Sequence, residues 1–169
     1  MNIADSIKVL IITLSDRASN GTYEDRSGPE IGILVSAYFQ DKGIPVTIQN
    51  SLIPDDPNQL KELINEAKES DIQVLFTTGG TGIGPKDFTP DVVREMLAKE
   101  IPGIMEMIRV KYGKQKPNAL VSRSIAGVAD SMLIYTLPGS VKAVREYCAE
   151  ILPTIIHSLK MLHGIDDHS

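Results

Sequence analysis

A run of glycines between residues 79 and 84 is the part of this sequence best suited to chemistry on a charged ligand. The glycines are Gly79, Gly80, Gly82 and Gly84, with Thr81 between them. Glycine adopts positive φ without strain and lets a ligand approach the backbone, so such a loop can surround an anion with N–H groups. Lys86 and Asp87 place a cation and a carboxylate directly after it. The segment predicts a phosphate-binding loop, although a tight turn without a ligand would use the same residues.

The loop follows neither of the common phosphate-binding motifs. A P-loop needs Lys directly after its last glycine, and here Pro85 follows Gly84. A dinucleotide-binding G-x-G-x-x-G fails at the same proline. The apolar residues 74–76 before the loop indicate a strand, and Thr89-Pro90-Asp91 after it predicts a helix start with Thr89 as N-cap. A strand, a glycine loop and a helix N-terminus together favour anion binding.

Further charged residues follow the ends of two predicted strands. Asp16 and Arg17 come directly after the first strand, and Asp55 comes after the second. Asp56 precedes Pro57 and is explained as a helix N-cap, whereas Asp55 has no such structural explanation. A surface ion pair would explain Asp16 and Arg17 equally well, and a solvated loop acid would explain Asp55. The positions of these residues alone leave both interpretations open.

These side chains favour phosphate chemistry without a protein nucleophile. The three histidines all lie near the C-terminus, Cys148 falls on the apolar face of a predicted helix, and no G-x-S-x-G motif is present. Mg²⁺ prefers oxygen ligands and commonly uses one or two carboxylates together with substrate phosphates. The acids at positions 16, 55 and 87 therefore suit phosphoryl or nucleotidyl transfer, in which positioning and charge stabilisation supply the catalysis.

Strands and helices alternate along the chain, and they are the elements that must position these residues. The predicted strands cover 7–14, 44–48, 73–77 and 131–137. The predicted helices cover 29–42, 57–70, 91–100, 104–113, 141–152 and 155–162, with Pro153 expected to break or kink the chain between the last two. Mostly apolar strands that alternate with helices predict an α/β fold whose mainly parallel sheet is covered on both faces.

The predicted topology gathers four distant segments at one edge of the sheet. Right-handed crossovers make the strands parallel, so their carboxyl ends meet at the same edge. The loop that starts at Asp16, the acid Asp55, the glycine loop and the turn Pro138-Gly139-Ser140 all follow strand ends. We therefore expect one pocket lined by all four segments.

Length and composition indicate one domain over residues 1–169, with 165–169 expected to form a frayed tail. The longest apolar run, Val9–Ile12, is far shorter than the roughly 18 residues of a membrane span, so no membrane partner is expected. The start of the chain does not resemble a signal peptide, and a single cysteine fits a reducing cytoplasm. The formal net charge of −5 argues against general nucleic-acid binding. A basic cluster of Arg109, Lys111, Lys114 and Lys116 is most simply interpreted as a solvated face.

The glycine segment resembles the signature of a known family. T-T-G-G-T-G-I-G-P-K-D-F-T-P-D, from Thr77 to Asp91, resembles the signature T-T-G-G-T-G-x-x-x-[RK]-D-x-T-P-[DE] of the molybdopterin-binding family of molybdenum cofactor biosynthesis. S-D-R-A-S-N-G-T-Y-E-D, from Ser15 to Asp25, is similar to its MogA-type branch. Ile53-Pro54-Asp55, Ser122-Arg123 and Leu137-Pro138-Gly139 match three further blocks in the expected order. The resemblance covers nearly the whole chain.

The resemblance implies a fold, an activity and the roles of particular residues. The family fold is a three-layer α/β/α domain with a mostly parallel sheet, commonly a homotrimer. Family members of the MogA type are Mg²⁺-dependent molybdopterin adenylyltransferases, which use ATP and molybdopterin and release pyrophosphate. By resemblance, Asp55 and Asp87 are the catalytic and metal-associated carboxylates. The phosphate-binding set is Gly79, Gly80, Thr81 and Gly82, to which we add Lys86, Asp16 and Arg17 from their positions; the pterin-side set is Ser122, Arg123, Pro138, Gly139 and Ser140.

Two departures from the family pattern concern the pterin side. The family often has Asn before Leu-Pro-Gly and Asn or Gln after it, where this chain has Thr136 and Ser140. Two alternatives stay open. One is a non-catalytic molybdopterin-binding protein of the MoaB-like branch, and the other is a trimeric scaffold that binds partner proteins without nucleotide. The protein that inserts molybdate in the next step of the pathway is a possible partner under the enzyme interpretation.

Overall fold

The computed structural model describes residues 6–165 and contains a six-stranded sheet of order β2-β1-β3-β6-β5-β4. The strands are β1 (Ile7–Leu14), β2 (Val46–Ile53), β3 (Val74–Thr78), β4 (Lys99–Glu100), β5 (Ala126–Ala129) and β6 (Met132–Leu137). β2, β1, β3 and β6 are parallel, whereas β5 pairs antiparallel with both β6 and β4.

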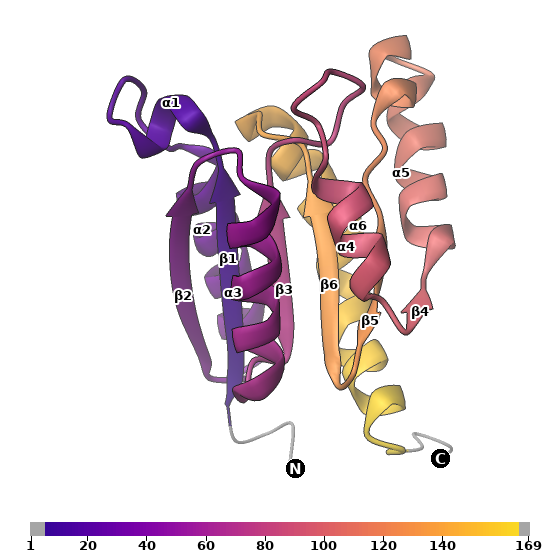
Figure 1. Cartoon of the computed structure of the whole chain (residues 1–169). Helices are drawn as coiled ribbons and strands as arrows, with labels where there is room; N and C mark the ends of the chain where they lie inside the picture. Colours follow the sequence, from indigo (N-terminus) through magenta and orange to yellow (C-terminus); the bar gives the residue numbers. More distant parts are fainter. Residues whose placement is uncertain (1–5, 166–169) are drawn as a thin grey trace.

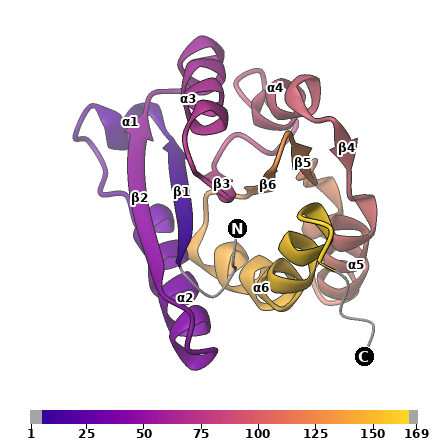
Figure 2. The same ribbon diagram turned by 90° about the horizontal axis from the view of Figure 1, so that it is seen from below.

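Helices cover both faces of this sheet (Figures 1 and 2). They are α1 (Asp16–Ser19), α2 (Ser27–Asp41), α3 (Pro57–Glu69), α4 (Thr89–Met96), α5 (Pro102–Gly113), the 3₁₀ turn η1 (Pro117–Val121) and α6 (Val141–Leu162). Seen along the strands in Figure 2, α2, α5 and α6 lie on one face and α3 and α4 on the other. The expected three-layer α/β/α fold with a mostly parallel sheet is confirmed.

The sequence of β1 explains why the sheet has two cores. Side chains alternate between the faces of a strand, so an apolar run buried on both sides must have two apolar partners. Ile7, Val9 and Ile11 pack into the core beneath α2, α5 and α6, whereas Leu10 and Ile12 pack into the core beneath α3 and α4. This double burial fixes β1 inside the sheet, between β2 and β3, and places its carboxyl end within the site edge.

Several boundaries differ from the sequence prediction. The sequence predicts that the second strand ends at 48, but β2 continues to Ile53 because its residues pair with β1 along the full length, from Ile7–Val46 to Leu14–Ile53. The helix expected over 91–100 ends at Met96, because Leu97 is extended and Lys99 pairs with Val128.

The hairpin that ends the sheet is absent from the sequence prediction. The sequence predicts only the strand 131–137 in this region, but Gly127 lies inside a further strand, β5, and only glycine fits there. A Cβ at Gly127 would lie 2.5 Å from the Lys99 carbonyl oxygen and 2.5 Å from Leu97 Cδ1. Glycine inside a strand commonly marks such a close backbone approach. The described chain therefore has six strands in place of the four expected.

Two predictions about helix ends are wrong. Thr89 is not an N-cap: it is the first residue of α4, fully buried, and its backbone N–H donates to Gly80 O at 3.1 Å beneath the glycine loop. Pro153 does not break the chain, because α6 is continuous through it. Pro153 and Ala149, whose carbonyl loses its helical partner, are both exposed, so water can satisfy that carbonyl.

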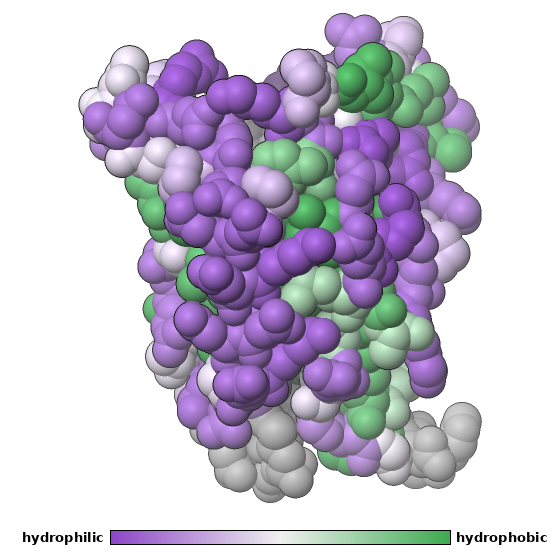
Figure 3. Space-filling view, in the orientation of Figure 1, coloured by the Kyte–Doolittle hydropathy of each residue, from purple (hydrophilic) through white to green (hydrophobic). Residues whose placement is uncertain are grey.

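The predicted tail lies, apart from Ile165, outside the described residues. Between residues 6 and 165, no helix has both the length and the apolar character that crossing a membrane requires. Figure 3 shows a largely hydrophilic face over α3 and α4, with hydrophobic surface at the upper tip near the end of α5. Two exposed apolar side chains of η1, Leu120 and Val121, belong to that end of the molecule.

Candidate active site

Two adjoining cavities open at the carboxyl ends of the parallel strands. The first, called here the strand-end cavity, has a volume of about 760 Å³ and is lined by segments that follow β1, β2, β3 and β6. The second, the helix-side cavity, has a volume of about 780 Å³ and extends from the glycine loop to α5 and α6. Four residues line both: Gly80, Asp87, Gly139 and Ser140. The predicted gathering of four distant segments at one edge is confirmed.

The glycine loop starts in a conformation that only glycine accepts. Gly79 has φ +106° and Gly80 has φ +64°. A Cβ at Gly79 would lie 2.3 Å from the Leu14 carbonyl oxygen, and its N–H donates to Leu137 O at 3.0 Å. Thr78 Oγ1 donates to Pro138 O at 3.0 Å. The loop is thus held between the ends of β1 and β6, which brings it against the turn that contains Gly139.

Arg123 stabilises the glycine loop through several hydrogen bonds. Its backbone N–H donates to Thr81 O at 2.9 Å, and its Nε donates to Gly82 O at 2.7 Å. One terminal nitrogen donates to both carboxylate oxygens of Asp91 at 2.8 and 2.9 Å, and the other donates to the carbonyl of Asp87. Arg123 lines neither cavity. Its guanidinium therefore organises the glycine loop, and its pterin-side role stays a prediction from the family resemblance.

Asp55 and Asp87 each keep one carboxylate oxygen available. Asp87 Oδ2 accepts from the backbone N–H of Gly84 at 2.7 Å, and Asp55 Oδ2 accepts from that of Asp16 at 3.3 Å. The Oδ1 atoms of Asp55 and Asp87 accept no hydrogen bond from the described residues. Both acids line the strand-end cavity, and Asp87 also lines the other.

Asp55 and Asp87 form a donor set that fits a Mg²⁺ ion whose remaining ligands come from water and substrate. Within residues 6–165, no group of three or more acidic, histidine or cysteine side chains could hold a metal ion. Mg²⁺ normally retains waters and binds through one or two carboxylates together with substrate phosphates. Two partly available carboxylates beside a phosphate-binding loop match that pattern, so Asp55 and Asp87 would be the protein ligands.

Asp16 connects Asp55 to Lys86. Asp16 Oδ1 accepts from the Asp55 backbone N–H at 2.9 Å, the reciprocal of the bond from Asp16 N–H to Asp55. Asp16 Oδ2 lies 2.5 Å from Lys86 Nζ. The hydrogen bond from Lys86, aided by that from Asp55 N–H, lowers the pKa of Asp16, and the same pair raises the pKa of Lys86. Asp16 therefore positions Asp55 and Lys86, and as an anion it is unsuited to bind phosphate itself.

Two further charged residues of the first loop, Arg17 and Asp25, differ in whether they are free to contact a ligand. Arg17 lines the strand-end cavity, with its guanidinium carbon 5.5 Å from the centre of the Tyr23 ring. Asp25 lines it too, but both of its oxygens are used: Oδ2 accepts from Thr13 Oγ1 at 2.7 Å, and Oδ1 accepts from the N–H groups of Ser27 and Gly28. Asp25 fixes the start of α2, whereas Arg17 is placed to meet an anionic ligand.

The predicted pterin-side residues divide between the cavity and its support. Ser122, Pro138, Gly139 and Ser140 line the helix-side cavity. Ser140 also caps α6 by accepting from Ala143 N–H at 3.2 Å. Thr136 is fully buried, and its Oγ1 accepts from the N–H of Ile125, the residue before β5, at 2.8 Å, so it does not line the cavity. Of the two departures from the family pattern, only Ser140 lies where a ligand could touch it.

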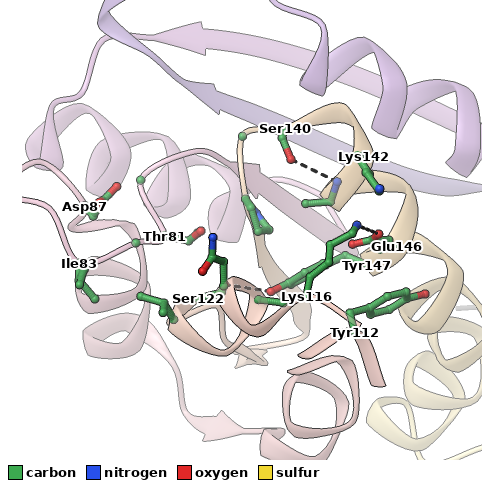
Figure 4. Close-up of a pocket in the computed structure, with 18 of the residues that line it drawn as sticks. Thr81, Ile83, Asp87, Tyr112, Lys116, Ser122, Ser140, Lys142, Glu146 and Tyr147 are labelled. Carbon is green, nitrogen blue, oxygen red and sulfur yellow. Dashed lines mark hydrogen bonds and ion pairs between the residues drawn. The ribbon is translucent and has the colours of Figure 1, made fainter. Parts of the chain in front are cut away.

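Sequence reasoning missed the far wall of the helix-side cavity. This wall comes from α5, η1, the segment between them and α6, and its polar residues are Tyr112, Lys116, Asn118, Lys142, Glu146 and Tyr147. Figure 4 shows Glu146 and Tyr147 across the cavity from Asp87 and Ile83. Lys116 Nζ lies 2.7 Å from Glu146 Oε1, and Tyr147 OH donates to Ser122 Oγ at 2.9 Å. The sequence places Lys116 on a solvated face, and no local motif marks it otherwise.

The far wall carries more positive than negative charge. Lys142 lies beside Lys116, and the hydrogen bond with Lys116, together with the charge repulsion between the two side chains, lowers the pKa of Lys142. Glu146 is the main cause of the raised pKa of Lys116. The arrangement can therefore accept an anionic ligand between the glycine loop and α6, and Arg17 and Lys86 offer cations to a second ligand in the strand-end cavity.

Comparison with known proteins assigns a family to this arrangement. A family model described as a probable molybdopterin binding domain matches residues 10–157. The molybdopterin adenylyltransferase of Helicobacter pylori J99 is 33% identical over 160 residues, covering 94% of this chain and 89% of that protein. Gephyrin of Dictyostelium discoideum is 35% identical over 160 residues, but this chain spans only 22% of its length.

Solved structures agree with these sequence matches. A structure of MogA superposes with a TM-score of 0.81 at 31% identity, covering 92% of this chain and 99% of that one. The molybdopterin biosynthesis enzyme MoaB of Thermus thermophilus superposes with a TM-score of 0.80 at 32% identity, covering 94% and 97%. The chain is similar to both branches to the same degree.

Proposed function

The chain belongs to the family of molybdopterin-binding domains, and from that premise we propose that it is a molybdopterin adenylyltransferase. In this reaction a terminal phosphate oxygen of molybdopterin attacks the α-phosphorus of ATP. A new P–O bond forms to the AMP group, and the bond to pyrophosphate breaks. The products are adenylylated molybdopterin and pyrophosphate, in molybdenum cofactor biosynthesis.

The observation that carries the proposal is the shared wall between the two cavities. Gly80, Asp87 and Gly139 line both cavities, so two ligands would meet at the glycine loop. ATP would occupy the strand-end cavity, where Arg17 and Lys86 can offset phosphate charge. Molybdopterin would occupy the helix-side cavity with its phosphate at residues 80–84. Holding both reactants in this way lowers the barrier by removing the entropy cost of their encounter.

Each residue of the shared region has a role in this proposal. The N–H groups of the glycine loop would orient the phosphates, and Lys86 would stabilise the charge that develops on pyrophosphate. Asp55 and Asp87 would hold Mg²⁺, which when bound supplies charge neutralisation on the triphosphate. Asp16 would keep Asp55 and Lys86 in place through the bonds described above. A cytoplasmic homotrimer that passes its product to the molybdate-inserting protein belongs to the same proposal.

The test is release of pyrophosphate from ATP and Mg²⁺, with and without molybdopterin. We expect molybdopterin-dependent release, and in Asp87→Asn we expect the rate to fall by about two orders of magnitude or more while molybdopterin affinity changes little. Asp41→Asn is the matched control, because Asp41 pairs with Lys42 on the surface and lines neither cavity. Tight molybdopterin binding without pyrophosphate release would instead support the non-catalytic binding protein.

A further inference from the structure

The helix-side cavity offers different chemistry at its two ends. At one end are the glycine loop and Asp87, and at the other is the ion pair of Lys116 with Glu146 (Figure 4). Asp87 and Glu146 are the two carboxylates among the described residues that line this cavity, and Figure 4 shows them on opposite sides of it. A ligand that fills the cavity therefore meets an anion-binding loop at one end and a carboxylate next to an ammonium group at the other.

The ion pair presents an acceptor beside a donor. Glu146 comes from α6, and Lys116 comes from the segment between α5 and η1. Lys116 occupies Oε1 at 2.7 Å, whereas Oε2 accepts no hydrogen bond from residues 6–165. The Glu146 side chain is 21% exposed and that of Lys116 is 40% exposed, so both are partly removed from water while they still reach the cavity. Partial burial strengthens charge-assisted hydrogen bonds to a ligand.

We propose that the Lys116–Glu146 pair recognises the pyrimidine edge of the pterin, an inference that rests on molybdopterin being the substrate of this cavity. A pterin carries two adjacent donors, N3–H and the 2-amino group, next to an acceptor, the 4-oxo oxygen. The Glu146 carboxylate accepts from the two donors, and Lys116 donates to the 4-oxo oxygen. The phosphate of the same molecule then lies at the glycine loop. The two ends of the cavity thereby fix the orientation in which molybdopterin binds.

A second ion pair on α6 shows that position, and not pairing alone, distinguishes Glu146. Glu150 lies one turn further along α6, and its Oε1 is 2.6 Å from Lys111 Nζ. The Glu150 side chain is 18% exposed, close to the value for Glu146. Glu150 lines neither cavity. The two acids therefore share a helix, a lysine partner and similar burial, and of the two only Glu146 lines the cavity; Glu150 Oε1 also accepts from Tyr112 OH at 3.1 Å.

The experiment measures binding of two ligands that differ at one group. 6-Hydroxymethylpterin monophosphate carries the 2-amino group, and the corresponding lumazine monophosphate carries an oxygen there. Fluorescence titration without ATP gives the dissociation constant of each. We expect wild-type protein to bind the pterin at least tenfold more tightly, about 1.4 kcal/mol, because the lumazine oxygen faces the Glu146 carboxylate.

Variants assign that discrimination to Glu146. Glu146→Gln should reduce the affinity ratio to near one, since a carboxamide can donate to the lumazine oxygen as well as accept from the pterin. Glu150→Gln should keep the wild-type ratio. Lys116→Met should weaken both ligands by a similar factor, because both carry the 4-oxo oxygen. Thermal unfolding of each variant verifies that it is folded.

Equal binding of the two ligands by wild-type protein would overturn the inference, and two results with the variants would do the same: a wild-type ratio retained in Glu146→Gln, or an equal loss of the ratio in Glu150→Gln. None of these depends on adenylyl transfer. If pyrophosphate is released but the two ligands bind alike, the edge recognition is wrong and the proposed reaction stands. If the ligands are discriminated but pyrophosphate is not released, edge recognition stands and the chain is a binding protein.

Discussion

Gly79 can be tested by adding a single methyl group at the point where the glycine loop leaves the sheet. In Gly79→Ala the new Cβ would lie 2.3 Å from the carbonyl oxygen of Leu14 at the end of β1. That oxygen belongs to the backbone of a central strand, so it cannot rotate away as a side chain would. The loop must shift, and its bond from Gly79 N–H to Leu137 O must lengthen or break.

Gly21 provides a matched comparison for the size of this effect. Gly21 also has positive φ, +79° against +106° at Gly79, but a Cβ there meets no atom within 4 Å. Gly21→Ala should therefore cost only the backbone strain of a left-handed alanine, about 1–2 kcal/mol. Gly79→Ala adds a clash with backbone, and overpacking of this kind costs about 1–3 kcal/mol. The free energy of unfolding should therefore fall by roughly 2–5 kcal/mol in Gly79→Ala.

Urea unfolding of both variants and of wild type measures these values, and the pyrophosphate assay measures the consequence for the site. Gly79→Ala should lose activity at urea concentrations well below its unfolding midpoint, because the loop moves away from Asp16 and the strand-end cavity. Gly21→Ala should retain wild-type activity. Equal destabilisation by the two substitutions would refute the contact with Leu14, and full activity in Gly79→Ala would refute the positioning role of this glycine.

Two further predictions concern Asp16 and alkaline pH. In Asp16→Asn the amide oxygen can still accept from Asp55 N–H while the attraction for Lys86 is lost, so KM for ATP should rise with little change in kcat. Asp16→Ala loses both bonds and should lower kcat as well. Identical kinetics in the two variants would contradict the reciprocal bond between Asp16 and Asp55. Burial raises the pKa of the Cys148 thiol from 9.0 to about 12, and it raises the pKa values of Tyr112 and Tyr135 from 10.0 to about 12. The unfolded chain therefore releases these protons first, so the stability that the neutral groups contribute is complete below about pH 9 and is lost between about pH 9 and 12. Urea midpoints measured from pH 8 to 11 should fall above pH 9, and a rise over that interval would contradict the burial of these groups.

The sequence predicted the strand-end half of the site because its signals are local. β1 is a continuous apolar run, the glycine loop has a distinctive composition, and the carboxyl ends of parallel strands must meet. Asp55 could be singled out because Asp56 already explained the helix start, and the structure places Asp55 beside Asp16. Each of these residues is marked by its own stretch of sequence, and the rule for parallel strands then brings the stretches together.

The far wall of the helix-side cavity could not be predicted in the same way, because it depends on contacts between distant segments. Lys116 and Glu146 are 30 residues apart, and in sequence each is an ordinary charged helix-face or loop residue. Arg123 looked like a ligand-binding cation, yet its donors reach Gly82, Asp87 and Asp91 behind the loop. The short strand β4 is two residues long, and its pairing depends on the close approach that Gly127 permits. Local pattern carries no information on which of several charged residues a fold will bring together.

The paired cavities bear on the choice between an enzyme and a binding protein. A protein that only holds molybdopterin needs one cavity, with phosphate at the glycine loop and the ring near α6. Here a second cavity of nearly equal volume adjoins the first, and it contains Arg17, Lys86 and the partly available carboxylate of Asp55. The wall between them consists of Gly80, Gly139, Asp87 and Ser140, with no bulky side chain to separate two ligands. Because ligands in the two cavities would meet at this wall, the geometry favours transfer between two substrates over storage of one.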